Sequence, residues 1–221
     1  MELDASDRIL LINKPLEWTS FDVVKKLRGI LKIKKIGHAG TLDPLATGLL
    51  ILCTGKMTKR IDTFQAQEKE YTGKMILGQT TPSYDLETAP TSPQDISGIT
   101  EQMIQDVASK FTGTIAQVPP LHSAVKVDGK RAYKLARAGS EAKLKAREIT
   151  IMEFEITHIN LPEVGFRVVC TKGTYIRSLV HDVGQALGVG AYLSELCRTR
   201  IGDFLLKDAQ TLEELVHEDL S

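Results

Sequence analysis

The stretch from Gly37 to Gly48 places one carboxylate, Asp43, in a segment rich in glycine, threonine and proline. Its three glycines permit backbone conformations that other residues avoid, and Pro44 fixes the backbone directly after the acid. The apolar run 49–53 follows and is short enough to be a buried strand. Catalytic and binding groups tend to lie in loops that a rigid scaffold holds. An Asp-Pro pair is more often only a turn, so the segment is either a tight turn or a functional loop.

Hydrophobic periodicity predicts strands and helices in mixed order. Thr19 and Asp22 form a capping-box pattern ahead of an apolar helical stripe. In the expected helix 100–111, Met103 shares one side with the apolar residues, and Met152 begins a period-two pattern in the strand 149–158. Segment 79–98 has no periodicity and is expected to be an irregular loop on the surface. Further strands are expected at 8–13, 49–53, 69–77 and 165–171, and a further helix after 172–174. Without a strict βαβ rhythm, this order predicts an α+β fold with a mostly antiparallel sheet in one domain.

Composition excludes several classes of protein. The three cysteines are odd in number and far apart, which argues against a disulfide framework or a zinc site. The acidic start has no apolar segment behind it, and no apolar run approaches the length of a membrane span. We therefore expect a cytoplasmic protein that does not engage a membrane.

The charges are unevenly distributed although the formal net charge is zero. Residues 1–60 and 120–150 are rich in Lys and Arg, whereas 80–110 and 203–221 are rich in Asp and Glu. These segments could form a positive face for an anionic polymer, or they could be ordinary solvated helix faces.

A second notable cluster is Lys172-Gly173-Thr174-Tyr175-Ile176-Arg177-Ser178. Tyr175 and Arg177 flank the apolar Ile176, so they need not point into the core. An arginine that faces a loop carboxylate would hold it ionised and oriented. The alternative is a surface arginine and a tyrosine at the edge of the core.

Two more residues are candidates for contact with a base. Tyr71 offers an aromatic face, but it could be a half-buried strand tyrosine. His38 could stack on a base or donate to a phosphate, but it could simply be exposed. No grouping has metal-ligand spacing, and the glycine patterns that bind dinucleotides or phosphates are absent. The candidates that remain are a single carboxylate, an arginine, tyrosines and basic surface residues. They suit covalent or acid–base chemistry on an uncharged part of an anionic polymer.

The segment Gly37–Leu50 resembles the catalytic motif of the TruB-type tRNA pseudouridine synthases. Further segments fall in that family's order: Lys14-Pro15 with Thr19-Ser20, Lys69-Glu70-Tyr71 with Gly73, Pro119-Pro120 with Ser123-Ala124 and Lys126, and 172–179. The resemblance runs from about residue 8 to Phe204, which is nearly the whole chain.

The resemblance implies a pseudouridine-synthase catalytic fold that isomerises uridine 55 in the T loop of tRNA without cofactor or metal. Asp43 matches the catalytic aspartate, Arg177 its partner, and Tyr71 the tyrosine that stacks on the flipped base. His38 matches the histidine that fills space vacated in the RNA loop. Tyr175 and Leu196 match pocket residues. Base-modifying enzymes generally extrude their target, and stacking contributes roughly 1–3 kcal/mol per base toward that cost.

Three departures from the family pattern bear on how the chain works. Glu17 stands where the family usually has glycine, so that turn is expected to differ. Cys197 replaces the first arginine of a Leu-Arg-Arg-Thr pattern. Many members carry a C-terminal PUA domain; here we expect a catalytic domain, 1–204, with a short acidic helical tail, 205–221. RNA is then expected to be held through Lys25–Lys35 and Lys126–Arg147 by a monomer.

Two alternatives stay open. The first is a non-catalytic RNA-binding or tRNA-folding protein on the same scaffold, which would not need Asp43. The second is a glycoside hydrolase with Asp43 as nucleophile. That chemistry normally requires a second acid, for which Asp85 or Asp182 would have to fold nearby.

Overall fold

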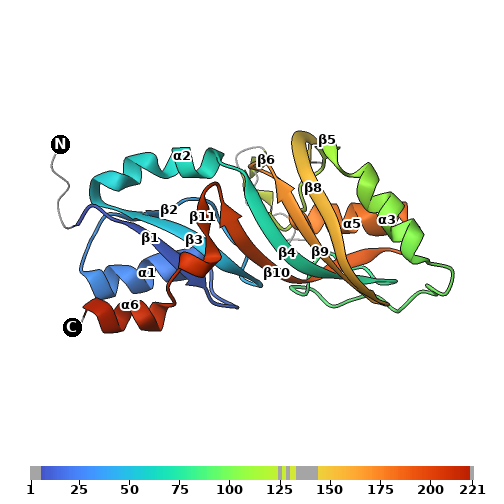
Figure 1. Cartoon of the computed structure of the whole chain (residues 1–221), viewed down its shortest axis with the longest axis horizontal. Coiled ribbons are helices and arrows are strands. Elements are labelled where there is room, and N and C mark those ends of the chain that lie inside the picture. The colour runs from blue at the N-terminus through green and yellow to red at the C-terminus, as the bar shows by residue number, and fades with distance from the viewer. Residues whose placement is uncertain (1–5, 124–125, 128–129, 133–143, 220–221) are drawn as a thin grey trace. The chain divides into compact units, whose positions relative to one another are not determined.

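The computed structural model describes residues 6–123, 126–127, 130–132 and 144–219. The chain folds as two compact units, residues 1–72 with 196–221 (unit 1) and residues 73–195 (unit 2). Strands β4 (Lys69–Leu77) and β10 (Ala191–Ile201) contribute residues to both units (Figure 1). No helix in the described part of the chain has the length and apolar character needed to span a membrane.

The sheet of unit 1 is organised around one central strand, β3 (Ala46–Thr54), which is the buried strand predicted after the glycine segment. It pairs antiparallel with β1 (Ile9–Lys14) and β2 (Ile36–His38). Its first residues pair parallel with β10, and β11 (Phe204–Leu205) pairs antiparallel with β10. The sheet is therefore mixed and mostly antiparallel, which confirms the predicted α+β class.

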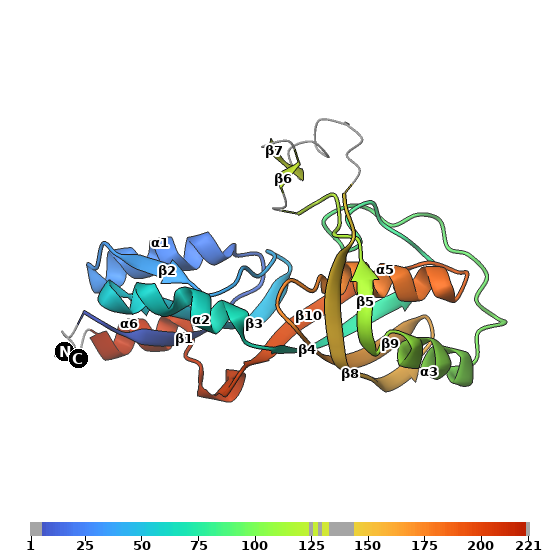
Figure 2. The same cartoon turned by 90° about the horizontal axis from the view of Figure 1, so that it is seen from above.

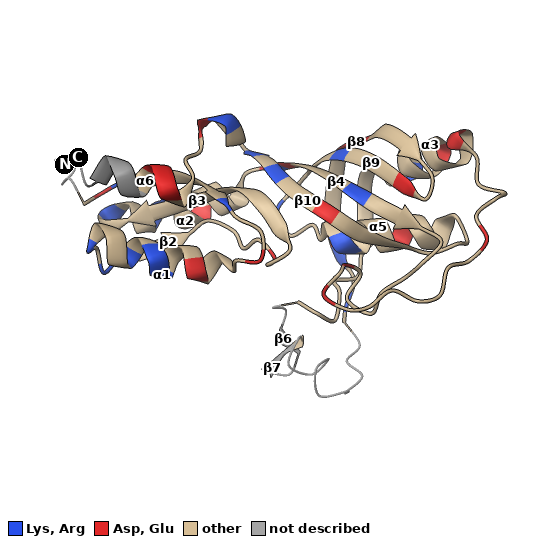
Figure 3. Cartoon of the chain, turned by 90° about the horizontal axis from the view of Figure 1, so that it is seen from below, with Lys and Arg blue, Asp and Glu red and all other residues tan. Residues whose placement is uncertain are grey.

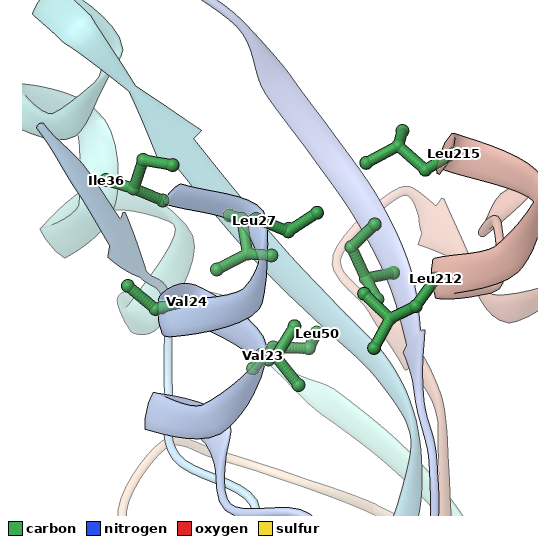
Figure 4. Close-up of a cluster of buried hydrophobic side chains, with 9 residues drawn as sticks. Val23, Val24, Leu27, Ile36, Leu50, Leu212 and Leu215 are labelled. Carbon is green, nitrogen blue, oxygen red and sulfur yellow. The ribbon is translucent and has the colours of Figure 1, made fainter. Parts of the chain in front are cut away.

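Helices cover both faces of this sheet because alternate residues of β3 point to opposite sides. Leu50 and Leu52 pack with helices α1 (Ser20–Leu31) and α6 (Leu212–Asp219). On the other face, residues of β3 pack with the 3-10 helix η1 (Gly55–Arg60) and helix α2 (Ile61–Ala66). Figure 4 shows Leu212 and Leu215 of α6 directed at the side chains of α1. The acidic tail thus includes a helix, as expected, and this helix completes a core cluster.

Helix α1 begins where the sequence predicts. Thr19 is its N-cap, and the reciprocal bonds of the capping box with Asp22 are both present. The apolar stripe faces inward, with Val23, Val24 and Leu27 buried. This helix start lies against the segment that carries Asp43, since Ser20 bonds to Leu42.

In unit 2 the strand order is β4, β9 (Glu163–Cys170), β8 (Arg147–Asn160) and β5 (Gly113–Gln117), and the β9–β8 and β8–β5 pairs are antiparallel. Helix α3 (Glu101–Lys110) contacts both β8 and helix α5 (Ile176–Ala186) (Figure 2). Thr100 is the N-cap of α3, and its side chain accepts from the Met103 N–H. A short ladder of β6 (Lys126–Val127) and β7 (Lys130–Arg131) stands apart from the sheet.

Three local expectations in unit 2 are wrong. Met103 is 40% exposed on α3 instead of buried. Met152 is exposed because the β8–β9 register shifts between Ile151 and Glu153, which breaks the period-two pattern at that point. Segment 79–98 is irregular, as expected, but it is not all surface, since Thr81, Ser83 and Asp85 are buried.

Candidate functional site

Asp43 lies in a short irregular stretch that connects β2 to β3 in unit 1, and its side chain is half-buried. Gly40 and Gly48 have φ values of +97° and +101°, which explains the choice of glycine at both positions. Gly37 is different, since it lies in β2. A Cβ there would come within 2.6 Å of Ile61 Cδ1, so this position requires close packing and not an unusual backbone.

Buried polar groups hold the Asp43 segment from both sides. The Ser20 hydroxyl accepts from the Leu42 backbone N–H at 2.9 Å. The Arg198 side chain is 1% exposed; its Nε donates to the Leu49 carbonyl at 2.8 Å and its NH2 to the Gly40 carbonyl at 3.2 Å. The segment is therefore anchored before and after Asp43.

Lys14 is a fully buried cation beneath the same segment. Its ammonium donates to the backbone carbonyls of Pro15, Trp18 and Pro44 at 2.8, 2.6 and 3.3 Å. These three acceptors match the three donors of an ammonium group. Burial lowers the pKa of Lys14 from 10.5 to about 8; the negative charge of Asp43 opposes that shift, and the positive charge of Arg198 adds to it. Lys14 thus links the turn at 15–18 to the residue that follows Asp43.

Glu17 adopts the backbone conformation that glycine would favour at its position. Its φ is +67°, and its backbone N–H donates to the Pro44 carbonyl at 2.8 Å. The expectation that Glu17 changes this turn is therefore wrong for the backbone, because the left-handed conformation is present despite the side chain. Non-glycine residues adopt it at a cost of about 1–2 kcal/mol.

The remaining candidates of unit 1 lie on strands around the Asp43 segment. His38 ends β2 and is half-buried instead of simply exposed. Burial lowers the pKa of His38, the backbone of Gly40 opposes the shift, and Arg198 adds to it, so the imidazole is neutral near pH 7. Tyr71 is 9% exposed on β4. Leu196 is half-buried on β10, in register with Ala46.

Cys197 lines a cavity of about 320 Å³ in unit 1. Lys14, Thr47, Leu212 and Glu213 are among the other lining residues.

Arg177 belongs to unit 2 and is 4% exposed, so the expectation that it need not point into the core is wrong. Its NH1 donates to the Ser83 carbonyl at 3.2 Å and its NH2 to the His122 carbonyl at 3.0 Å. Its Nε lies 3.6 Å from Oδ2 of Asp85, which is also buried. The guanidinium is thus held in one orientation. The expected partnership of Arg177 with Asp43 joins residues of the two units and stays a prediction.

Tyr175 is the N-cap residue of α5 and is half-buried. Gln117 holds its backbone from both sides: the Gln117 Oε1 accepts from the Tyr175 N–H at 2.8 Å, and its Nε2 donates to the Tyr175 carbonyl at 3.1 Å. The Ser178 hydroxyl donates to the Val118 carbonyl at 2.8 Å. The last residue of β5 and the residue after it therefore fix the start of the helix that carries Arg177.

The two acids considered for a hydrolase have other surroundings. Asp85 faces the Arg177 guanidinium. Burial raises the pKa of Asp182 to about 6. Among the described residues, no three His, Cys, Asp or Glu side chains are grouped so that they could hold a metal ion.

Exposed cations follow α1, the residues after it and η1. Figure 3 shows Lys and Arg along α1. The set comprises Lys25, Lys26, Arg28, Lys32, Lys34, Lys35, Lys56, Lys59 and Arg60. Most of the second expected basic segment, Lys126–Arg147, lies outside the described residues.

Comparison with known proteins agrees with this arrangement of motifs. The model of the TruB family pseudouridylate synthase N-terminal domain matches residues 28–176, and that of the tRNA pseudouridylate synthase B C-terminal domain matches residues 177–220. In the crystal structure of a Cbf5-Nop10-Gar1 complex, one chain matches with a TM-score of 0.76 and 35% identity, over 96% of this chain and 54% of that one.

Curated relatives are similar over most of their length. The tRNA pseudouridine synthase B of Flavobacterium johnsoniae is 54% identical over 209 residues, which are 91% of this chain and 91% of the relative. That of Chlorobaculum tepidum is 48% identical over 214 residues, 95% of this chain and 89% of the relative. The chain therefore belongs to the TruB family of pseudouridylate synthases.

Proposed function

We propose that this chain converts a uridine of tRNA to pseudouridine, with uridine 55 of the T loop as its target. The observation that carries the proposal is the anchoring of Asp43: Ser20 and Arg198 bond the segment on both sides of it. Relatives named tRNA pseudouridine synthase B, at about half identity over nearly the whole chain, support the reaction and the substrate class.

The reaction exchanges one bond of the uridine for another. The bond between the ribose C1′ and N1 of the base breaks, the base rotates, and a bond between C1′ and C5 forms while a proton is lost from C5 and one is gained at N1. Electrons and atoms balance within the nucleotide, so the reaction consumes no second substrate. We propose that the enzyme supplies a carboxylate and a site that excludes water. We assign the carboxylate to Asp43.

The other candidates complete the site in roles that suit their chemistry. Tyr71 stacks on the extruded base, and the neutral imidazole of His38 fills the space that the uridine leaves in the RNA loop. Arg177 orients Asp43 and keeps it ionised, because a nearby cation favours the charged form of a carboxylate. Tyr175 and Leu196 line the pocket.

The RNA outside the pocket is proposed to bind the cations of α1 and of the residues directly after it, Lys25 to Lys35. Six exposed Lys and Arg side chains lie between these positions, and phosphate contacts by such residues supply much of the affinity for RNA. We propose that the protein works as a monomer in the cytoplasm.

The deciding experiment compares wild type with Asp43→Asn on unmodified tRNA, with pseudouridine mapped by position. We expect pseudouridine at position 55 with wild type and none with Asp43→Asn, which keeps the size of the side chain and removes its charge. Equal product from both proteins would remove Asp43 from the mechanism. A wild type that binds tRNA and forms no pseudouridine would favour the RNA-binding alternative.

A further inference from the structure

Phe21 is the most exposed large apolar side chain in the described part of the chain, at 60%. Leu16, in the turn before α1, follows at 55%. Scattered exposed apolar residues are normal and need no explanation. Here, however, the two most exposed ones occur five residues apart, and Phe21 is the one aromatic residue in that exposed set.

The backbone around these two side chains is fastened to the Asp43 segment. Ser20, which precedes Phe21, exchanges hydrogen bonds with Leu42, at 2.9 Å from the Leu42 N–H and at 3.3 Å to its carbonyl. Glu17, which follows Leu16, donates to the Pro44 carbonyl at 2.8 Å. The residues on both sides of Asp43 are thus bonded to the immediate neighbours of the two exposed side chains.

The exposed face of α1 continues from Phe21 as a row of cations. Residues three or four positions apart share a face of a helix, which places Lys25 and Arg28 on the face of Phe21, and Lys32 continues the row at the C-cap. All four side chains are exposed, while Val23, Val24 and Leu27 are buried in the core cluster shown in Figure 4. Two acids are nearby: Asp22 is engaged by the capping box with Thr19, and Glu17 is exposed in the turn next to Leu16.

We propose that Phe21 is a stacking platform for an unpaired base of the substrate RNA, with Lys25, Arg28 and Lys32 on the adjoining phosphates. Proteins that bind single-stranded nucleic acid combine aromatic side chains with a cationic track in this way. A protein partner fits less well, since lysine is depleted at protein–protein interfaces. The inference rests on the proposed function for the identity of the RNA, and it assigns to α1 a base contact outside the catalytic pocket.

The test measures RNA affinity in an Asp43→Asn background, which prevents turnover. Two probes are used: a hairpin with the T-stem and T-loop sequence, and a fully paired duplex of the same stem. Phe21→Ala is expected to weaken hairpin binding roughly tenfold and to leave duplex binding unchanged, because stacking acts on an unpaired base. Phe21→Trp should restore hairpin binding. Lys25→Gln should weaken both probes, because phosphates are present in both.

Matched controls separate this contact from a loss of structure. Alanine is a better helix former than phenylalanine at an exposed helix position, so the unfolding midpoint of Phe21→Ala should be no lower than that of its parent. Met103→Ala, another exposed apolar truncation on a helix, should change neither affinity. Hairpin binding that survives Phe21→Ala, or an equal loss on hairpin and duplex, would overturn the platform. Suppose that Phe21→Ala weakens hairpin binding alone and that the wild type, with Asp43 intact, forms no pseudouridine. This result would support the stacking role of Phe21 and contradict only the proposed function.

Discussion

The Nε of Arg177 lies 3.6 Å from Oδ2 of Asp85, and both side chains are buried in unit 2. We expect Asp85→Asn to lower kcat by roughly 10- to 100-fold with a smaller change in KM, because small displacements of a positioned group cost that much in rate. Single-turnover kinetics with tRNA would measure it. Glu101→Gln, an exposed change on α3 in the same unit, is the control. Unchanged single-turnover rates for Asp85→Asn would show that the pair serves only stability.

The buried ammonium of Lys14 should titrate near pH 8. The pKa of Lys14 in the folded state lies below the ordinary lysine value of 10.5, which applies to the unfolded chain. Between about pH 8 and pH 10.5 the unfolded state therefore binds more protons than the folded state, so the free energy of unfolding rises with pH. Carbon-13 NMR of the lysine Cε positions would show one resonance with a midpoint near 8, absent in Lys14→Met. A set of lysines that all titrate near their usual value would contradict it.

Glu17→Gly should raise the free energy of unfolding. The wild-type residue holds φ +67°, and removing the Cβ relieves a left-handed strain of about 1–2 kcal/mol, less the entropy that glycine adds to the unfolded chain. The expected net gain is roughly 0.5–1 kcal/mol, measured by urea denaturation. Lys32→Gly, at φ +51° and away from Asp43, is a parallel site where a similar gain is expected. A lower unfolding midpoint for Glu17→Gly would mean that the Glu17 side chain makes a stabilising contact.

Asp182→Asn should stabilise the protein at neutral pH. Burial raises the pKa of this carboxyl to about 6, so the folded state holds the proton between about pH 4 and 6 and stability falls as pH rises through that window. The neutral amide that Asp182→Asn introduces would avoid burying a charge. We expect the free energy of unfolding of this variant to be about 1 kcal/mol higher than that of wild type at about pH 7.5, and the difference to vanish below about pH 4. Thermal unfolding at the two pH values would measure it. Asp106→Asn, on the exposed face of α3, should show no such difference.

Affinity for tRNA should fall steeply with salt, because cation contacts with phosphate release counterions. Each Lys→Gln change among Lys25, Lys32 and Lys34 should reduce the slope of log affinity against log salt by about one for a residue that contacts a phosphate. Filter binding between low and physiological ionic strength would measure it. A nearly flat salt dependence in the wild type would contradict the α1 cations as the RNA-binding surface.

Regular elements were predictable from the sequence where side chains repeat with one period. The stripe of α1, the buried run of β3 and the inward face of α5 follow directly from spacing. Met152 shows the limit, since one extra residue in a bulge reverses the face of a strand and leaves no mark in the pattern.

The candidate site was predictable in its residue types and less so in its surroundings. Lys14 was visible only as part of a motif, and lysine is rarely fully buried, so its place beneath Asp43 could not be anticipated. Asp85 lies in a segment without periodicity, where contacts such as the one with Arg177 depend on the path of the loop. Burial of charged groups is decided by tertiary packing, which local sequence does not encode.

The division of unit 1 into two stretches of chain has a consequence for biosynthesis. Residues 73–195, which form unit 2, are all available before the chain reaches Leu196. The strand partner of Ala46 and the leucines that cover α1 come only afterwards, with Leu212 and Leu215 among the last. The element carrying Asp43 therefore acquires part of its surroundings only after unit 2 has been synthesised, so we expect the nascent protein to remain inactive until synthesis has passed Leu215.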